Sequence, residues 1–448
     1  RGLYSPNRNY NAPSDVEDAE LRSGYSSDLE PRTRRLLLNA NYHHSDLLGQ
    51  DFYLQASYRK EDDNFYPFPY YNRATPTGSR GVYFAASQQN FEVTSLKGLF
   101  AKQWDTLKLT YGVDLDRERF NAEQTTFNAL TSSESGGLEL EKDSKAARYP
   151  SYRVDGVSVY AQLDWHATNN LTFSGGARRQ QMDVDVSDFK GVPGGSNDYQ
   201  VNLFNVGAIY DFKNGHQVWS NYGEGFDLPD PAKYYGKPGL SVADNPLAGI
   251  KSRQVELGWR YADLDWDAQA ALYYIWSDKI INVDSQTLTI NVQEQKSRDF
   301  GFEGALTRHF QTGWEAGGTL HLTRSEEEAA DGGWIKRDAR YASLSKATAF
   351  VGWKGDGRSA RLQANHAFSL KDDADHEIDG YTTFDLLGRQ DTGFGTFSAG
   401  IQNLLDKQYS TVWGQRATLF YSPTYGPAYL YDYQGRGRTY TLTWSMAY

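Results

Sequence analysis

The C-terminal segment carries the pattern that most constrains the fold. Its apolar residues occupy every second position from residue 440, and small or polar residues lie between them: Tyr440, Leu442, Trp444, Met446 and Tyr448 alternate with Thr441, Thr443, Ser445 and Ala447. A period of two predicts an extended strand with one apolar face and one small, polar face. The pattern continues to the last, aromatic residue, where a soluble domain usually frays. We therefore interpret the segment as a strand whose apolar face lies against hydrocarbon.

The composition agrees with a membrane barrel better than with other classes. Aromatic residues make up 15% of the chain, which is too many for a disordered protein, although only 39% of the residues are hydrophobic. The sequence contains no run of about twenty apolar residues, so it excludes a helical membrane protein. A barrel strand needs only one lipid-facing residue in two, and its aromatics form girdles at the membrane interfaces.

Several kinds of chemistry are excluded by the same composition. The chain has no cysteine, which rules out disulfides, zinc–thiolate sites and cysteine nucleophiles. A net charge of -11 argues against a nucleic-acid partner. No nucleophile elbow, zinc-protease motif or phosphate loop occurs, and the histidines lack ligand spacing. We expect no enzyme activity, no cofactor and no resident metal. The acidic run Glu326–Glu328 could bind calcium, but we expect a solvated loop there.

Alternating segments recur in pairs along the chain and predict hairpins. One pair runs from Val157 to Trp165 and returns from Leu171 to Val186 after a short turn. A second pair runs from Val255 to Tyr261 and returns from Leu264 to Trp276. We count about seventeen such strands between Thr33 and Tyr448, each roughly ten to fifteen residues long.

The connections between these strands are short on one side and long on the other. The expected long connections span residues 61–80, 121–151, 227–249, 323–341 and 406–435. This asymmetry is typical of outer-membrane barrels and not of soluble sandwiches. We therefore predict an all-β, transmembrane antiparallel β-barrel in the outer membrane of a Gram-negative bacterium. Bacterial barrels close with an even number of strands, so an odd count predicts upstream strands missing from this chain. We interpret residues 1–32 as an extracellular loop that continues from that missing part.

Four motifs, in order, resemble those of TonB-dependent outer-membrane receptors for ferric siderophores. They are Tyr222–Pro229 (YGEGFDLP), Asn245–Gly258 (NP…ELG), Ile401–Tyr409 (IQNLLDKQY) and Gly435–Tyr440 (GRGRTY). Within that family, the segments Val412–Ala417 and Tyr421–Ala428 are most similar to receptors for citrate-hydroxamate siderophores such as aerobactin. The resemblance covers residues 33–448.

The resemblance implies a function in energised import. Members are 22-stranded barrels with a plugged lumen, and residues 33–448 would supply the C-terminal part of such a barrel, without the plug domain. The implied receptor binds a ferric siderophore at its extracellular face and imports it with TonB energy, carrying iron only as the siderophore complex. Implied partners are the TonB–ExbB–ExbD complex through the missing N-terminal part, the plug domain, the upstream strands, and outer-membrane lipid and lipopolysaccharide.

A ferric hydroxamate with free carboxylates is anionic, so its receptor needs arginine for charge and aromatic rings for contact area. The long loops supply both, and the ligand-binding candidates are Tyr66, Tyr70, Tyr71, Arg73, Trp334, Arg337, Trp413, Arg416, Tyr421, Tyr425 and Tyr429. Packing between loops, or an interfacial aromatic belt, explains the same residues equally well. Lys237 and Arg340 are weaker candidates. Polar residues expected in the lumen, such as Glu256 and Arg438, would pair with the plug or with neighbouring strands.

Two other functions remain open at this point. A passive outer-membrane porin would use the same strand pattern but would not need the motifs at Ile401–Tyr409 and Gly435–Tyr440. An outer-membrane enzyme would need a paired nucleophile or acid on the lumen wall, and none occurs at a useful spacing. The sequence encoded upstream would decide between receptor and channel.

Overall fold

The computed structural model describes residues 32–65, 68–72, 81–128, 130–131, 140–285, 287–422, 428 and 433–446. Nineteen strands form one antiparallel sheet, and two of them, β3 (Phe68–Asn72) and β16 (Trp334–Lys336), are short additions to β4 and β15. Seventeen strands therefore make up the continuous wall, and the expected strand count is confirmed.

Each wall strand pairs with the next along the chain. The strands are β1 (Arg32–Leu47), β2 (Gln50–Asn64), β4 (Gly81–Gln103), β5 (Leu107–Phe127), β6 (Lys142–His166), β7 (Leu171–Val186), β8 (Gly195–Asp211), β9 (His216–Asp227), β10 (Ile250–Ala262), β11 (Trp266–Ser277), β14 (Ser297–His309), β15 (Trp314–Glu328), β17 (Lys346–Gly355), β18 (Arg358–Ala367), β21 (Tyr381–Thr392), β22 (Gly395–Gln402) and β23 (Thr439–Ser445). Such a meander needs only hairpin connections.

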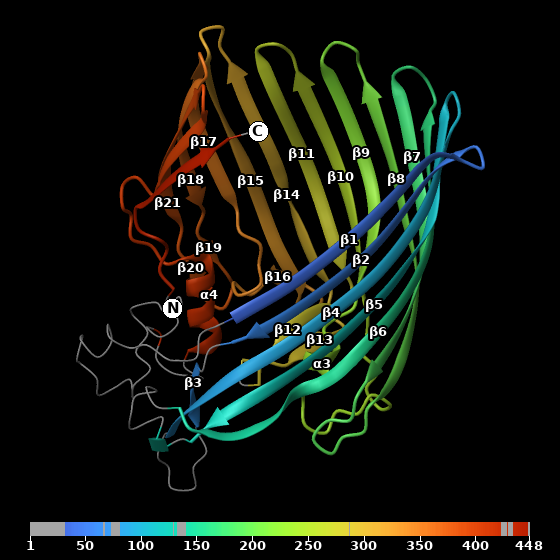
Figure 1. Cartoon of the computed structure of the whole chain (residues 1–448), viewed down its shortest axis with the longest axis vertical. Helices are drawn as coiled ribbons and strands as arrows, with labels where there is room; N and C mark the ends of the chain where they lie inside the picture. Colours follow the sequence, from blue (N-terminus) through green and yellow to red (C-terminus); the bar gives the residue numbers. More distant parts are fainter. Residues whose placement is uncertain are drawn as a thin grey trace.

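The wall curves round into an open cylinder (Figure 1). Among the described residues, β1 pairs only with β2 and β23 pairs only with β22, so these two strands are its edges. The elements outside the wall lie at one end: the hairpins β12 (Ile280–Val283) with β13 (Ile290–Gln293) and β19 (Leu370–Lys371) with β20 (Glu377–Ile378), and the helices α3 (Pro231–Tyr234) and α4 (Val412–Tyr421). No described helix has the length and apolarity to cross a membrane.

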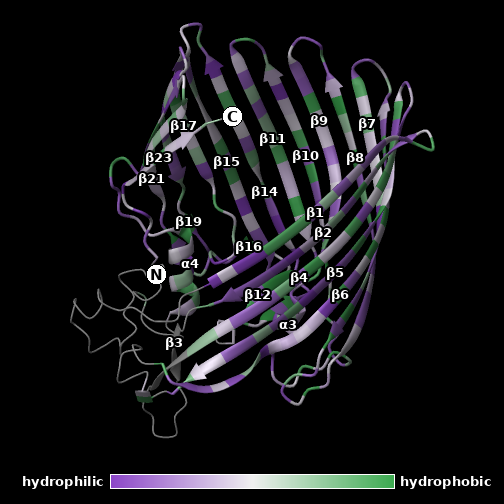
Figure 2. Cartoon of the chain, in the orientation of Figure 1, coloured by the Kyte–Doolittle hydropathy of each residue, from purple (hydrophilic) through white to green (hydrophobic). Residues whose placement is uncertain are grey.

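The two faces of the wall differ in chemistry. Val113 and Leu115 of β5 are 38% and 41% exposed, whereas Asp114 between them is 4% exposed and accepts a hydrogen bond from Arg178 at 2.8 Å. The apolar side chains therefore face outward and the paired polar ones face the lumen, and Figure 2 shows the alternating hydropathy along the strands. Trp259 and Trp444, 37% and 53% exposed, also lie on the surface, which excludes a layered soluble sandwich.

The outward apolar residues form a band of limited height. On β5, the outward series Leu107, Leu109, Tyr111, Val113 and Leu115 is followed by Arg117. Ten residues of tilted strand rise about 25 Å, which is the height of the apolar band of an outer-membrane barrel. The wall is thus built to contact hydrocarbon over that height.

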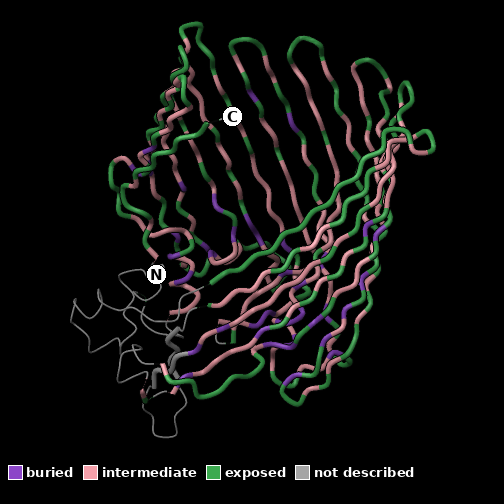
Figure 3. The backbone as a smooth tube through the Cα atoms, in the orientation of Figure 1, coloured by how far each residue is buried: buried purple, intermediate pink, exposed green. Residues whose placement is uncertain are grey.

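Short turns join the strands at one end of the wall. The turn between β17 and β18 places Asp356 and Gly357 at φ values of 49° and 70°, which is the type I′ geometry that Asp-Gly favours in hairpins. At the other end the connections are long, and most of the buried residues gather there (Figure 3).

The structure corrects the expected lengths of several elements. Residues 121–151 are largely strand, because β5 and β6 are 21 and 25 residues long and continue beyond the apolar band. There both faces meet water or loops, so the hydrophobic alternation that marks a strand disappears while the backbone ladder persists. The hairpins β12–β13 and β19–β20 were not expected. The expected loop at 1–32 lies outside the described residues, except for Arg32, which begins β1.

Candidate functional site: the long-loop cluster

Five long loops at one end of the wall form the candidate site. We call them loop A (228–249, with α3), loop B (278–296, with β12 and β13), loop C (329–345, with β16), loop D (368–380, with β19 and β20) and loop E (403–438, with α4). Contacts between side chains and backbone link all five, so the loops form one connected structure above the wall.

Loop A packs against the inner face of the wall. Asp230 caps α3 by accepting hydrogen bonds from the backbone N–H groups of Ala232 and Lys233. The next residue after the helix, Tyr235, is 3% exposed in a core with Tyr152 and Val184. Its hydroxyl accepts from Leu247 N at 2.8 Å and donates to Asn245 O at 3.0 Å, and burial raises its pKa. These hydrogen bonds hold the end of loop A, at Asn245 and Leu247, against its beginning at Tyr235.

Lys237 joins loop A to loop B. Its ammonium group donates to the side-chain oxygen of Asn291 and lies 5.3 Å from the centre of the Tyr234 ring. Burial lowers the pKa of Lys237, and the charge of Asp284 opposes that effect. Because the ammonium group is engaged in these contacts, Lys237 has a structural role in the cluster.

Tyr341 of loop C is the meeting point of three loops. Its hydroxyl accepts a hydrogen bond from Val283 N of loop B at 3.0 Å, and its ring contacts the Phe420 ring of loop E edge-on at 6.0 Å. The guanidinium groups of Arg337 and Arg340 lie 5.9 and 5.7 Å from the centre of the Tyr341 ring. Two aromatic rings and two arginines thus meet where the loops converge.

The two arginines differ in how far they are neutralised. Arg340 forms a 2.5 Å ion pair with Asp338, and the hydrogen bond to that carboxylate raises the pKa of Arg340. Arg337 has no carboxylate within 4.0 Å in the described part of the chain, although the charge of Glu327 acts on it. Its Nε is buried without a described hydrogen-bond partner. Arg337 therefore keeps a positive charge that no close carboxylate among the described residues neutralises, and we call Arg337, Tyr341 and Phe420 the arginine–aromatic cluster.

Arg416, a predicted ligand-binding residue, holds two loops together. Its Nε donates to Ala339 O at 3.1 Å and its terminal nitrogen donates to Ala342 O. Burial lowers the pKa of Arg416. The helix that carries it, α4, begins at the Thr411 cap, which accepts from Gly414 N at 2.9 Å. A side chain at position 414 would collide with the Tyr433 backbone at 2.4 Å, so the close approach requires glycine.

The other predicted ligand-binding residues are scattered or outside the described part. Trp413 is 60% exposed at the start of α4, and Tyr421 ends the helix. Trp334 lies on the outer side of the wall, where the Arg298 guanidinium is 3.9 Å from its ring centre, away from the cluster. Only the backbone of Tyr70 and Tyr71 is described, in β3. Tyr66, Arg73, Tyr425 and Tyr429 lie outside the described residues.

Loop D supports loop C through Asp372. This carboxylate accepts hydrogen bonds from Ala339 N, Ala374 N and His376 N, each at 2.9 Å, and lies 2.9 Å from the His376 ring nitrogen. Asp338, Asp372 and His376 have donor atoms within 4.8 Å of one another, as a metal site requires. However, Asp372 is already occupied by these bonds and Asp338 by Arg340, so the group is a clasp between loops.

Sequence reasoning missed Tyr341, Phe420 and Asp372. Arg337 and Arg416 were predicted, and the structure brings both to loop C. The expected pairing of lumenal polar residues with neighbouring strands is found for Glu256, which accepts from Trp219 Nε1 at 2.6 Å. The solvated loop expected at residues 326–328 is wrong for Glu326, which is 3% exposed between Arg298 and Arg324.

The comparison with protein families decides the identity of the wall. Residues 1–404 match the family described as TonB dependent receptor-like, beta-barrel. The chain belongs to this family. It is 38% identical to the ferric aerobactin receptor of Klebsiella pneumoniae, over 96% of this chain and 62% of that protein. It is 37% identical to the rhizobactin receptor of Rhizobium meliloti, over 95% of this chain and 60% of that protein. The chain thus spans about three fifths of the length of these relatives.

The solved structures agree on the fold. The copper transporter OprC superposes with a TM-score of 0.72 at 16% sequence identity, covering 92% of this chain and 65% of that one. The predicted all-β barrel and the predicted family are confirmed, and the chain is an outer-membrane protein. The family is one of receptors and transporters, and nothing found supports the porin alternative.

Proposed function

We propose that this chain is the barrel part of an outer-membrane receptor that binds a ferric citrate-hydroxamate siderophore, such as ferric aerobactin, and imports it with TonB energy. The similarity to an aerobactin receptor and a rhizobactin receptor supports the ligand class. The observation that carries the proposal is the arginine–aromatic cluster, where Arg337 lies over Tyr341 without a close carboxylate. Iron is cargo in this scheme, and no cofactor takes part.

The cluster suits an anionic, partly flat ligand. A guanidinium without a close carboxylate can form a charge-assisted hydrogen bond with a carboxylate of the ligand, and such a bond is about twice as strong as a neutral one. The rings of Tyr341 and Phe420 offer apolar contact area beside that charge. In the proposed complex Arg337 binds a free carboxylate of the siderophore, and the exposed Trp413 and the partly exposed Tyr421 extend the surface along α4.

The edges of the wall support the proposed partners. Unpaired backbone groups at β1 and β23 would be costly in hydrocarbon, so further strands of the same polypeptide complete the barrel in the proposal. A plug domain inside the lumen and the TonB–ExbB–ExbD complex would then provide the energised step. Lipid and lipopolysaccharide would cover the apolar band.

Ligand binding by the full-length receptor tests the proposal. We expect purified receptor to bind ferric aerobactin, measured by quenching of tryptophan fluorescence, more tightly than ferrichrome, and Arg337→Gln to weaken that binding about tenfold, since one charge-assisted contact is lost. The matched control, Arg358→Gln at the short-turn end, should bind like wild type. Preference for ferrichrome, or unchanged binding by Arg337→Gln, would overturn the respective part of the proposal.

A further inference from the structure

Two of the family motifs, IQNLLDKQY and GRGRTY, lie at the two ends of loop E, and the arginine–aromatic cluster uses neither of them. The chain leaves β22 after Gln402 and enters β23 at Thr439, and these two residues are the last partners in the ladder between the strands. The two motifs therefore meet directly beyond the end of that ladder. We call residues 403–411 and 433–438 the stem of loop E.

Asn403 is the centre of the stem. It is 4% exposed and has a φ of 49°, a left-handed conformation that asparagine tolerates better than most residues. Its side chain donates to Lys407 O at 2.9 Å and to Arg436 O at 3.0 Å, and it accepts from Lys407 N at 2.9 Å. Its backbone N–H donates to Asp385 of β21 at 2.9 Å. One buried residue thus joins both segments of the stem and ties them to the wall.

Further bonds connect the stem to the start of β23. The Asp406 carboxylate accepts from Arg438 N at 2.7 Å, and Arg438 Nε donates to Leu404 O at 3.0 Å. Farther along the stem, Gly435 N donates to Tyr409 O at 2.7 Å, and a side chain at position 435 would lie only 2.1 Å from the Tyr409 ring. Because Arg438 immediately precedes β23, these bonds fix the point at which the strand begins.

The ladder between β22 and β23 contains little that selects its own register. Neither strand carries a charged residue. Gly400 lies opposite Thr441. A slip by two residues would bring Thr439 or Thr443 to the same place, and on the other face it would exchange one large apolar residue for another. Such a slip also keeps each face on its own side of the wall, because side chains alternate with a period of two.

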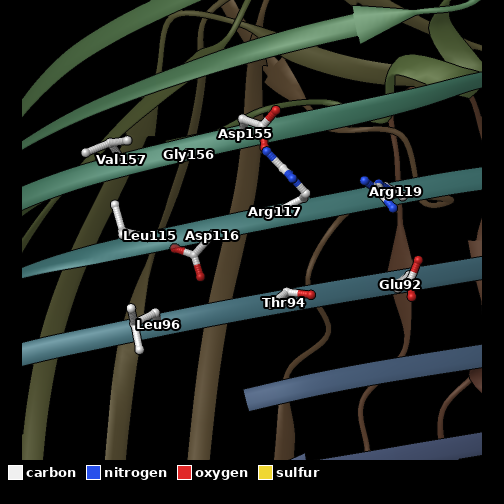
Figure 4. Close-up of a pocket in the computed structure, with 10 residues that line it drawn as sticks. All are labelled: Glu92, Thr94, Leu96, Leu115, Asp116, Arg117, Arg119, Asp155, Gly156 and Val157. Carbon is white, nitrogen blue, oxygen red and sulfur yellow. The ribbon is translucent and has the colours of Figure 1, made fainter. Parts of the chain in front are cut away.

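Other parts of the wall mark their register with unlike side chains. In Figure 4, Leu115 and Val157 are neighbours on β5 and β6, and Arg117 and Asp155 point toward each other two residues farther along. A slip by two residues there would place a charged side chain opposite an apolar one and break the ion pair. A slip between β22 and β23 would break the hydrogen bond from the Trp444 indole to a main-chain oxygen of the short turn, at 3.2 Å, but this is a single exposed bond.

The connection to β23 and its neighbours also leave the register open. Loop E is the longest of the five loops, whereas a hairpin turn of about two residues fixes the register by its length. Among the described residues β23 pairs only with β22, so no second described neighbour holds it. The stem selects one register, because sliding β23 by two residues would move Arg438 about 7 Å along the strand, away from Asp406.

We propose that Asn403, Asp406 and Arg438, the stem triad, fix the register of β23 against β22 and thereby the register in which the barrel closes. Strand register, tilt and diameter are linked in a closed barrel, so one slipped pair would alter the whole cylinder. The stem triad also holds both ends of the loop that carries α4. This role of the two motifs is conformational and does not depend on the siderophore.

Disulfide trapping in the full-length receptor measures this register. The chain has no cysteine of its own, so an introduced pair is the only pair within it. Ser398 and Thr443 are direct partners, and Ser398→Cys with Thr443→Cys should cross-link in the wild-type background. Ser398→Cys with Thr441→Cys, or with Ser445→Cys, reports a slipped register. These diagonal Cα atoms lie about 7–8 Å apart, beyond the disulfide range of about 4.4–6.8 Å, so neither pair should cross-link in wild type.

The stem variant combines Asn403→Asp with Asp406→Ala. Aspartate also tolerates a left-handed φ but cannot donate to Arg436 O, and alanine removes the acceptor of Arg438 N. We expect cross-linking of the slipped pairs, relative to the direct pair, to rise about tenfold or more, because the bonds that select one register are lost. Asp406→Asn keeps an acceptor oxygen and should behave as wild type. The matched control Asp375→Ala replaces a left-handed aspartate of loop D, with a φ of 63°, and should also behave as wild type.

Three results would overturn the assignment. One is a stem variant that folds, as judged by heat-modifiable migration on a gel, and in which only the direct pair cross-links. A second is equal cross-linking of the direct and slipped pairs in the wild-type background. If the stem variant does not assemble, the direct cysteine pair should restore assembly in the oxidising periplasm, since the disulfide fixes the same register. The third is the absence of that rescue.

Discussion

Arg416 Nε donates a hydrogen bond to the backbone oxygen of Ala339 at 3.1 Å, although 77 positions separate the two residues in the chain. The same guanidinium donates to Ala342 O, so a side chain of loop E holds the main chain of loop C. Carbonyl oxygens accept the hydrogen bonds of this half-buried cation in place of a carboxylate. The position of the arginine–aromatic cluster therefore depends on α4.

Replacing Arg416 should loosen loop C without harming the wall. Arg416→Met removes both hydrogen bonds but keeps an apolar side chain of similar length, so we expect faster cleavage of loop C by protease added to whole cells. Ferric aerobactin binding should weaken about tenfold, because two buried carbonyls lose their donors. The neighbouring exposed variant Trp413→Met is the control for protease access. Equal protection of the Arg416→Met and wild-type loops would contradict the role assigned to this contact.

Tyr341 can be divided into its ring and its hydroxyl. Tyr341→Phe removes the bond from Val283 N but keeps the contacts with Arg337 and Phe420, so we expect a loss of ligand affinity of about threefold to tenfold. Tyr341→Ala also removes the ring and should weaken binding by at least a further tenfold. Fluorescence titration with ferric aerobactin measures both. Identical affinities for the two variants would show that the ring does not contribute.

Acid should open the clasp between loops C and D. Burial alone would raise the pKa of Asp372, but the hydrogen bonds from Ala339 N, His376 N and the His376 ring outweigh it and lower the pKa below the ordinary value of 3.8. A carboxylate with a depressed folded pKa stabilises the loop above its unfolded pKa, and the stabilisation is lost as pH falls through the folded value. We expect the protection of the backbone amides of residues 336–345 against hydrogen exchange, relative to their intrinsic exchange rates, to fall below about pH 4. Asp372→Asn should show fast exchange already at pH 7.

A charged side chain introduced on the outward face of the wall should destabilise the barrel. Val113→Arg places a guanidinium inside the apolar band and should destabilise the barrel by about 2 kcal/mol, the lower end of the range of about 2–4 kcal/mol for the midplane. Thr110→Arg introduces the same group on the lumenal face of the same strand and should cost much less. Urea unfolding in lipid vesicles compares the two. A larger effect of the lumenal variant would reverse the assignment of the two faces.

The bounds of two wall strands show how much of the wall the sequence predicts. The return strand expected at Leu171–Val186 has these bounds as β7, and the alternation at Tyr440–Trp444 lies in β23. Both strands were predictable because alternate residues of a membrane strand face hydrocarbon whichever strand lies beside them. The resulting period of two is visible in the local sequence. The long ends of β5 and β6 were not predictable, because beyond the apolar band both faces of these strands meet water or loops and the sequence no longer alternates.

The amino-acid sequence by itself determined the strand pattern, the apolar band and the family motifs. Only the tertiary structure decided what the loop residues do. Arg337 and Arg416 belong to the same residue type and both lie in polar loops. Arg337 lies over the Tyr341 ring with no carboxylate within 4.0 Å among the described residues, whereas the half-buried Arg416 donates to the carbonyls of Ala339 and Ala342. Trp334 likewise lies outside the wall on Arg298. The physical reason is that the role of a loop side chain depends on partners brought near by the closure of distant hairpins, and a local pattern carries no record of them.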